Sequence, residues 1–339
     1  MNTKIEIYKD IGSELKSLWL DLEKKSYNHC FQSFTWIIYL TNFYKKNNIF
    51  FLLQIILIRK DNKVVAILPF WIINQFGLKV LKWIGNNFSD YNGPIISQDY
   101  NYKKYEFLND FNLIKKKLEK FDVIYFERQP SSILQLENPF FFYLKNSNVF
   151  KTYFIITSNK FHNERFIKKS FLFFHSDNIL DYKKYINIIL DLKILQFSKN
   201  FFLKKNNDYR RSFYDKLVNI ESDNLKIYTS VLKFEDQELS YNFGILYKNY
   251  FYYLVPAYRD SLKKLSPGKL LLYKILDWCF ENSIYALDFG QGEEEYKKKI
   301  TDKYNYIGYY NYINSYKGYL FFIIINLKKI YFFKKLFFK

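Results

Sequence analysis

The order of strand-like and helix-like segments constrains this fold more than any other feature. In the first third, runs rich in Ile, Leu and Val at 50–59 and 63–73 flank the turn Lys60-Asp61-Asn62, which predicts a hairpin. In the last third, three strand-like runs lie at 225–233, 239–248 and 250–258. A helical segment at 267–282 and a further strand at 284–289 follow them. The first third likewise places a helical segment at 105–120 between strand-like runs at 78–84 and 122–127, so we predict two related α/β units.

The boundary between these units is expected in the less regular segment from Gln129 to about Asp191, which contains the turn-prone pieces QPSS and ENP. We therefore expect an N-terminal domain at 1–150, a connecting region at 151–192 and a C-terminal domain at 193–339. Within the first domain, Ser33 is the expected N-cap of a helix that continues to Tyr44.

The composition is that of a folded protein, and its positive charge does not by itself indicate the kind of partner. Hydrophobic residues make up 49% of the 339, which is ample for two cores. The net charge is +19, but the 52 Lys and Arg residues are spread along the whole chain and are not gathered in one arm or stripe. The charge by itself therefore does not indicate a nucleic-acid partner.

Cysteine and histidine usage predicts neither a disulfide framework nor a metal site. Cys30 and Cys279 lie far apart, and His29, His162 and His175 have no partners at metal or triad spacing, so we interpret them as structural. The N-terminus has charges in every apolar run, and no run reaches the roughly 18 uncharged apolar residues of a spanning helix. We therefore expect a cytoplasmic protein.

The triplet Ser266-Pro267-Gly268 has the pattern of a helix start, with Ser as N-cap and Pro in the first turn. Lys269 lies in that first turn, where a cation opposes the helix dipole. A bound anion, held by free backbone N–H groups with the lysine as its counter-charge, would explain this arrangement. The alternative is that lysine is simply abundant in this chain.

A carboxylate stands near the end of the short apolar strand 284–289. Asp288 is followed by Gly290 and Gly292, and the carboxyl end of a buried strand is where open α/β sheets bind ligands. Asp288 is thus a candidate general base, and the alternative is that it caps the following turn. Glu293 to Glu295 precede Lys297 to Lys299 by four residues, which predicts i,i+4 ion pairs on a solvated helix.

The motifs SPGKLLL at 266–272 and DFGQGEEEYK at 288–297 resemble the GNAT-like acyltransferases grouped with the CelD proteins, which are relatives of the Fem peptidoglycan aminoacyltransferases. In that family a Pro-Gly precedes a Leu-rich helix, and a strand ending in Asp-Phe-Gly is followed by Gly and Tyr-Lys. The resemblance extends over nearly the whole chain, through Phe31-Gln32-Ser33 with Trp36, Ile67-Leu68-Pro69, Ser89-Asp90-Tyr91, 122–130 and Tyr258. One departure is that Ser266-Pro267-Gly268 stands in the place of the phosphate loop common in single-domain GNAT enzymes, in which Gln or Arg is followed by glycines.

The resemblance implies an α/β fold of the α+β kind, with two tandem GNAT-like domains, each a mixed and mostly antiparallel sheet flanked by helices. It places the active site in the second domain, near its interface with the first. An amine would attack the thioester of acyl-CoA, the expected co-substrate, directly, so that no Ser or Cys nucleophile and no metal is needed.

The resemblance also implies roles for individual residues. Asp288 would be the base or a substrate anchor, Tyr258 the acid, and Ser266, Gly268 and Lys269 would hold the donor phosphates. The substrate-binding residues would be Asp90, Tyr91, Glu294, Tyr296 and Lys297, of which Lys297 would hold an anionic group. The acceptor expected from the family is an amino sugar or lipid-linked saccharide in cell-surface polysaccharide assembly.

Two alternatives remain at this point. The donor could be aminoacyl-tRNA, as in Fem proteins, although no long heptad-bearing segment provides the helical arm that those proteins commonly carry. In the other alternative the chain is a non-catalytic membrane-surface protein. The tail 317–339 mixes apolar runs with six lysines, a composition typical of a helix lying in an anionic interface on the inner face of the membrane.

Overall fold

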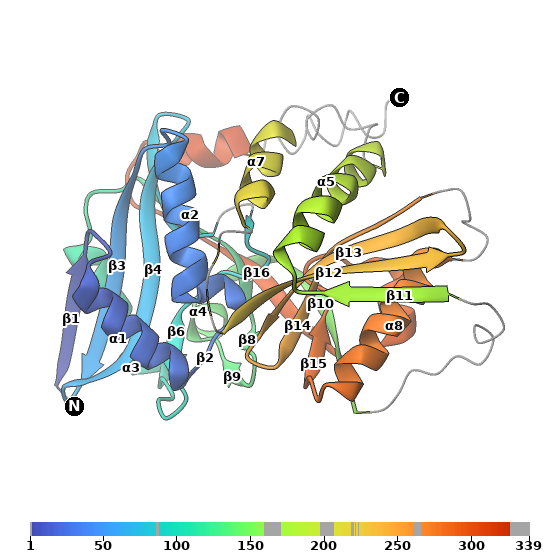
Figure 1. The fold of residues 1–339 in the computed structure, drawn as a ribbon. Coiled ribbons are helices and arrows are strands. Elements are labelled where there is room, and N and C mark those ends of the chain that lie inside the picture. The colour runs from blue at the N-terminus through green and yellow to red at the C-terminus, as the bar shows by residue number, and fades with distance from the viewer. Residues whose placement is uncertain are drawn as a thin grey trace. The chain divides into compact units, whose positions relative to one another are not determined.

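The computed structural model (Figure 1) describes residues 2–85, 88–158, 171–196, 207–217, 220, 222, 224–259 and 266–325. The chain divides into two compact units. Unit 1 comprises Met1–Phe150 and Asn305–Lys339, and unit 2 comprises Lys151–Tyr304. This arrangement differs from the division expected from the sequence, which kept 193–339 together, because a strand near the C-terminus pairs with a strand of unit 1.

Unit 1 is built on a mixed sheet in the order β1-β3-β4-β5-β7-β16, in which the pairing of β5 with β7 is parallel and the others are antiparallel. The short β6 pairs with β4 and with β2. The strands are β1 (Thr3–Tyr8), β2 (Ser26–Tyr27), β3 (Phe51–Lys60), β4 (Lys63–Gln75), β5 (Leu78–Trp83), β6 (Ile95–Ser97), β7 (Val123–Pro130) and β16 (Tyr304–Ile313), with a separate β8 (Ser132–Ile133) and β9 (Leu136–Glu137). The hairpin predicted around Asp61 and Asn62 is confirmed by β3 and β4.

Helices cover this sheet: α1 (Ser13–Lys24), α2 (Phe34–Lys46), α3 (Lys104–Lys117) and α4 (Pro139–Phe142), with a 3-10 turn η1 (Cys30–Gln32) before α2. Ser33 is the N-cap of α2, as predicted, and its hydroxyl accepts a hydrogen bond from the Trp36 N–H at 3.2 Å. One aromatic cluster in the core consists of Phe70, Trp83, Phe126 and Phe140, whose ring centroids lie 4.4 to 6.3 Å apart.

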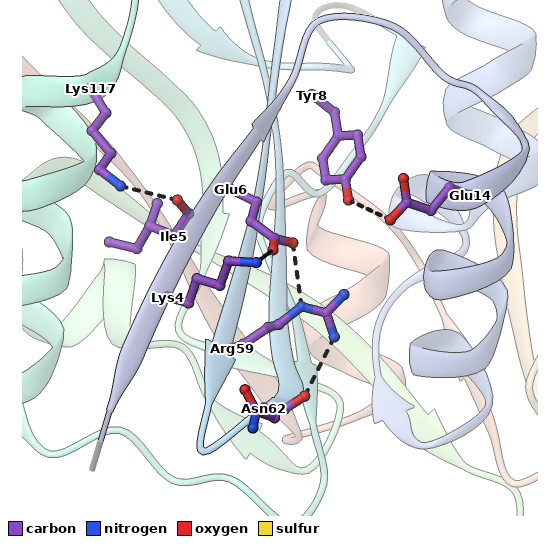
Figure 2. Close-up of polar contacts among 8 residues, drawn as sticks. All are labelled: Lys4, Ile5, Glu6, Tyr8, Glu14, Arg59, Asn62 and Lys117. Atoms are coloured by element: carbon purple, nitrogen blue, oxygen red, sulfur yellow. Dashed lines mark hydrogen bonds and ion pairs between the residues drawn. The ribbon is translucent and has the colours of Figure 1, made fainter.

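Charged side chains line the edge strand β1. Figure 2 shows Lys4 and Arg59 both reaching the carboxylate of Glu6, at 2.5 and 3.3 Å, while Lys117 donates to the carbonyl of Ile5 at 3.1 Å. Although burial acts to raise it, these two cations hold the pKa of Glu6 below its usual value. Charges of this kind on an edge strand discourage pairing with another sheet.

Unit 2 contains a second mixed sheet in the order β10-β15-β14-β13-β12-β11, in which only the described pairing of β14 with β15 is parallel. Its strands are β10 (Asn146–Ile156), which begins in unit 1, β11 (Phe171–Ser176), β12 (Leu225–Phe234), β13 (Gln237–Tyr247), β14 (Tyr250–Tyr258) and β15 (Ala286–Asp288). Its helices are α5 (Ile179–Gln196), α7 (Asn207–Leu217), α8 (Pro267–Glu281) and α9 (Glu295–Ile300).

The helices α5 and α8 lie on opposite faces of this second sheet (Figure 1). On one face, Tyr182 of α5 packs 5.8 Å from Phe243 of β13. On the other, Trp278 of α8 packs 5.9 Å from Phe251 of β14. The helix α8 also connects the parallel strands β14 and β15, so the carboxyl ends of both strands lie at the same end of the sheet as the start of α8.

Gly244 provides a test of the packing under α8. A Cβ at this position would lie 2.4 Å from Cζ of the buried Phe251 and 2.9 Å from the carbonyl oxygen of Tyr252. We expect Gly244→Ala to lower the free energy of unfolding by about 1–3 kcal/mol, because the ring must move within a packed core. Urea unfolding measures this change. Gly93→Ala, where the nearest atom is at 3.7 Å, is the control, and equal stability of both variants would refute the expectation.

The C-terminal part of unit 1 after β16 is helical over 318–325. Phe321 of this segment is buried and packs against Leu78, Val80 and Val123. The rest of the basic tail, 326–339, lies outside the described residues. In the part of the chain that the structure describes, no helix is long and apolar enough to cross a bilayer.

Candidate functional site

A pocket of about 470 Å³ lies in unit 2, which is a size typical of small-ligand sites. We call it the unit 2 pocket. Its wall combines Lys193 of α5, residues of β14, the start of α8, and Glu294 and Tyr296 at the start of α9. Six residues predicted from the sequence as site residues thus line one pocket, namely Tyr258, Ser266, Gly268, Lys269, Glu294 and Tyr296.

The pocket lies where the strands β14 and β15 stop pairing. β15 pairs with β14 only at Tyr250–Tyr252, and no other described strand pairs with β14 on that side along Tyr253–Tyr258. A β-bulge also interrupts β14, because Leu254 has no partner between the pairs formed by Tyr253 and Val255 with β13. Bulges redirect neighbouring side chains and are common beside active sites. Here the side chains of Tyr253 and Pro256, on either side of the bulge, reach the pocket.

The start of α8 forms a second wall of the pocket. Ser266 is the N-cap residue and Pro267 is in the first turn, as predicted, but Ser266 has left-handed backbone angles (φ 50°, ψ 56°) and its hydroxyl makes no capping bond. Its carbonyl accepts from the N–H groups of Lys269 and Leu270 at 2.9 and 3.2 Å. The ring of Tyr258 covers this turn, with Cδ1 3.6 Å from where a Cβ on Gly268 would lie. Lys263 and Lys264, just upstream, lie outside the described residues.

Asp288 is buried at the end of β15 and is not part of the pocket wall. Its Oδ1 accepts a hydrogen bond from the Gly290 N–H at 2.7 Å. This is the turn-capping contact that the sequence offered as an alternative to the role of a base. The next turn needs glycine at Gly290 and Gly292, whose φ angles are 62° and 110°.

Lys297 is 2% exposed and closes the loop that follows β15. Its Nζ donates to the carbonyls of Phe289, Gln291 and Gly292 at 3.1, 2.8 and 3.2 Å, and pairs with the Glu294 carboxylate at 2.8 Å. In this arrangement the lysine holds the main chain of the loop in place. The side chain that the sequence assigned to an anionic group thus contacts the protein's own backbone.

The predicted i,i+4 ion pairs of this segment are wrong. The described pairs are Glu294 with Lys297 and Glu295 with Lys298, both at i,i+3 spacing. For Glu293 and Glu294 the reason is that α9 begins only at Glu295, so these two residues do not follow helical spacing. Glu293 instead accepts from the backbone N–H of Lys151 at 2.6 Å.

The pKa values of two tyrosines in the pocket wall are raised. Burial and the neighbouring Tyr296 raise the pKa of Tyr253 well above its usual value. Burial and the nearby Glu294 likewise raise the pKa of Tyr296. Both phenols therefore remain protonated at neutral pH and can donate hydrogen bonds. Phe289 packs between them, at 6.1 Å from each ring.

The sequence reasoning missed the pocket residues Tyr253 and Pro256 and, among the charged ones, Lys193. It is half-buried, and burial lowers the pKa of its ammonium group; Lys297 lowers it further, while Glu294 acts in the opposite direction. A signal was available, because Lys193 follows Ile186 and Ile189 by seven and four residues and so continues the buried stripe of α5.

The motif residues of the first domain meet in the interior of unit 1. The Gln32 side chain donates to the Tyr91 carbonyl at 2.7 Å, and the Trp36 indole donates to the Ser89 hydroxyl at 3.0 Å. Tyr91 is 2% exposed and its ring lies 4.4 Å from that of His29. Asp90, beside it, is half-buried. All residues that line the unit 2 pocket belong to unit 2, so contact of Asp90 and Tyr91 with an acceptor stays a prediction.

Comparison with known proteins gives the fold and the type of domain. Residues 189–298, which include every residue named above as lining the pocket, match the family described as acetyltransferase (GNAT) domain. A search of curated protein sequences found no match.

Similar solved structures include FemX, with a TM-score of 0.61 at 12% identity over 92% of this chain and 97% of that one. They also include a tandem GNAT protein from the clavulanic acid biosynthesis pathway, with a TM-score of 0.53 at 8% identity over 93% and 99%. A third, with a TM-score of 0.50 at 9% identity over 91% and 93%, is the C-terminal domain of a protein described as a lysylphosphatidylglycerol synthetase from Agrobacterium fabrum.

At these identities the solved structures establish the fold alone, and the matched family identifies residues 189–298 as a GNAT domain. The predicted pair of tandem GNAT-like domains is confirmed. Residues 189–298 therefore form a GNAT-type acyltransferase domain, and the chain as a whole shares the fold of FemX and of the tandem GNAT protein.

Proposed function

We propose that this acyltransferase moves an acyl group from acyl-CoA to an amine or hydroxyl of a small acceptor, an amino sugar or a lipid-linked saccharide in surface polysaccharide assembly. The observation that carries the proposal is the composition of the unit 2 pocket. It brings a helix start, Tyr258, Tyr296 and the carboxylate of Glu294 to the carboxyl ends of two parallel strands, where α/β sheets bind ligands.

The pocket suits an acyl-CoA donor in two respects. Beyond Tyr252, no described strand pairs with β14 on the β15 side, so its backbone can bind the two amides of a pantetheine arm as an added strand would. The start of α8 with Lys269 then supports a role in binding the donor phosphates. An aminoacyl-tRNA donor, the alternative, would be recognised by binding that weakens steeply with salt.

The reaction needs three groups from the protein. The acceptor nitrogen attacks the thioester carbonyl carbon, the C–N bond forms, and the C–S bond breaks to release a thiolate. A base takes the proton from the amine, hydrogen-bond donors stabilise the developing charge on the carbonyl oxygen, and an acid protonates the thiolate. We assign Tyr258 as the acid. For the base there are two candidates, Asp288, which is the carboxylate predicted from the sequence, and Glu294, which lines the pocket, and the variants below decide between them.

A thiol-release assay tests the function and the base together. The full-length protein is supplied with several acyl-CoA donors and with amino-sugar acceptors. Asp288→Asn keeps an oxygen that can accept from the Gly290 N–H, so we expect normal folding and a fall in kcat of about 100-fold or more.

Glu294→Gln is the matched comparison in that assay. If Glu294→Gln lowers kcat more than Asp288→Asn does, Glu294 and not Asp288 is the base. If the wild-type protein neither binds CoA donors nor releases thiol with any acceptor, the proposed function is wrong.

A peripheral position on an anionic membrane is a second proposal, which concerns localisation. It is supported by the helical segment 318–325, in which Tyr319, Leu320 and Ile323 are more than half exposed. Exposed apolar side chains beside a basic tail favour binding at a lipid interface. Co-sedimentation with anionic vesicles that is unchanged by Leu320→Asp and Ile323→Asp together would contradict it.

A further inference from the structure

The first turn of α8 lines the unit 2 pocket, and its own N-cap does not hold it in place. The hydroxyl of Ser266 makes no capping bond, and Pro267 has no N–H group. Among residues 266–269, Pro267 is the buried one, whereas residues 270–272 are all buried. How far this first turn lies above the sheet therefore depends on the contact that the sheet makes with Pro267.

Ser240 of β13 provides this contact. Its side chain is fully buried, and its hydroxyl donates a hydrogen bond to the Pro267 carbonyl at 2.9 Å. That carbonyl also accepts the i→i+4 bond of the helix, because α8 begins at Pro267. Loss of the Ser240 hydroxyl would thus leave no carbonyl without a donor, and the fold would lose little stability. The bond contributes mainly to the position of the turn.

Tyr258 lies next to this bond. Ser240 and Tyr258 are paired residues of β13 and β14, so their side chains lie on the same face of the sheet, with Cβ atoms about 5 Å apart. The Tyr258 ring in turn covers Gly268, with Cδ1 3.6 Å from where a Cβ would lie. The ring therefore packs against the turn that Ser240 holds, and a displaced turn would leave the ring free to move.

We infer that Ser240 is a positioning residue for the reaction: it holds the first turn of α8 against the Tyr258 ring and so fixes the phenol hydroxyl in the pocket. Ser240 does not line the pocket itself, so it acts through Tyr258. The inference rests on the proposed function, in which Tyr258 protonates the departing thiolate. Because proton transfer needs its two heavy atoms at hydrogen-bond distance, a small shift of the ring slows this step.

Ser230 is a matched serine whose partner lies away from the pocket. It is equally buried on the neighbouring strand β12, and its hydroxyl oxygen lies 2.7 Å from the Nδ1 of His175. The His175 ring packs 4.1 Å from that of Trp278 in α8. Ser230 and Ser240 thus face the same helix from adjacent strands. They differ in their partners, because Pro267 lines the pocket and His175 does not.

A double-mutant cycle in the thiol-release assay tests the inference on the full-length protein. Ser240→Ala should lower kcat about 10-fold, with little change in the midpoint of urea unfolding. Tyr258→Phe should lower kcat further, because it removes the acid itself. In the Tyr258→Phe background, Ser240→Ala should have no additional effect on kcat, because residues that act through one group are not additive.

Two further variants serve as controls. Ser230→Ala should lower the urea midpoint and leave kcat unchanged, which is the reverse of the result expected for Ser240→Ala. Ser240→Thr keeps the hydroxyl and should retain more of kcat than Ser240→Ala does. Thermal unfolding shows whether each variant is folded, and Ser240→Cys, whose thiol is a weaker donor, replaces the Ala variant if that one is not.

The possible failures are distinguishable. An unchanged kcat in the folded Ser240→Ala variant, or an equal fall in kcat in both backgrounds, overturns the inference while acyl transfer stands. Wild-type activity of Tyr258→Phe would show that Tyr258 is not the acid, and the role of Ser240 would be wrong with that assignment. If the wild-type protein releases no thiol with any donor and acceptor, the proposed function itself is wrong, and so is the role of Ser240 in it.

Discussion

Replacing Lys297 by Met should lower the free energy of unfolding by about 2–4 kcal/mol and abolish acyl transfer. The ammonium group of Lys297 donates to three carbonyls of the loop after β15. Each buried acceptor left without a donor costs about 1–3 kcal/mol, and part of that loss is recovered because a buried charge is removed. The loop also positions Glu294 and Tyr296 at the pocket, so its release removes the geometry needed for transfer.

Urea unfolding and thiol release, measured on the same preparations, check this prediction. The control is Lys298→Met, because Lys298 pairs with Glu295 at the surface, where water screens the pair, and should contribute little to stability. If Lys297→Met is as stable as the wild-type protein but inactive, the structural role is wrong. Such a result would support the role predicted from the sequence, in which Lys297 holds an anionic group of the substrate.

Acidification from pH 7 to 4.5 should destabilise each unit by about 2–3 kcal/mol through one histidine. Burial lowers the pKa of His29 in unit 1 and of His175 in unit 2 to about 3. Above pH 6.5 both the folded and the unfolded chain carry neutral imidazoles, so these groups add no pH dependence there. As the pH falls from 6.5 toward 3, the unfolded chain takes up protons that the folded chain excludes, and stability falls by about 1.4 kcal/mol per pH unit for each histidine.

The His175→Phe variant tests this directly. The imidazole lies 4.1 Å from the Trp278 ring and 4.6 Å from the Tyr228 ring, and its Nδ1 is 2.7 Å from the Ser230 hydroxyl oxygen. A phenyl ring keeps the ring contacts and loses the hydrogen bond, so the variant should be less stable at pH 7 but should lose about 2–3 kcal/mol less on acidification. Urea unfolding at both pH values gives the difference, and equal losses for variant and wild type would show that His175 does not titrate as argued.

Features set by residues close in the sequence were predictable. The hairpin around Asp61 and Asn62, the N-cap Ser33 and the helix start at Pro267 each follow from a few neighbouring residues, and the structure confirms them. The grouping of Tyr258, Gly268 and Glu294 at one pocket depended on the family resemblance, because nothing local relates positions that far apart.

Features that depend on tertiary contacts were missed. The spacing of Lys193 from Ile186 and Ile189 is visible in the sequence, but only the packing of α5 shows that this stripe is buried and that the lysine reaches the pocket. The i,i+4 pairs failed because the start of α9 is set by the loop that Lys297 holds, which local charge spacing does not reveal. The pairing of β16 with β7 joins residues that are more than 170 positions apart, and no short-range pattern encodes it.

That pairing has a consequence for how the protein is made. The chain leaves unit 1 at Phe150 and returns to it at Asn305, so unit 2 is an insertion within unit 1. During synthesis, the last strand of the first sheet emerges only after the whole of unit 2, and until then β7 lacks the neighbour that covers one of its edges. Until β16 has been synthesised, the sheet formed by the N-terminal 150 residues therefore has an unpaired edge at β7. Such an edge can pair with strands of other chains and is a site for aggregation.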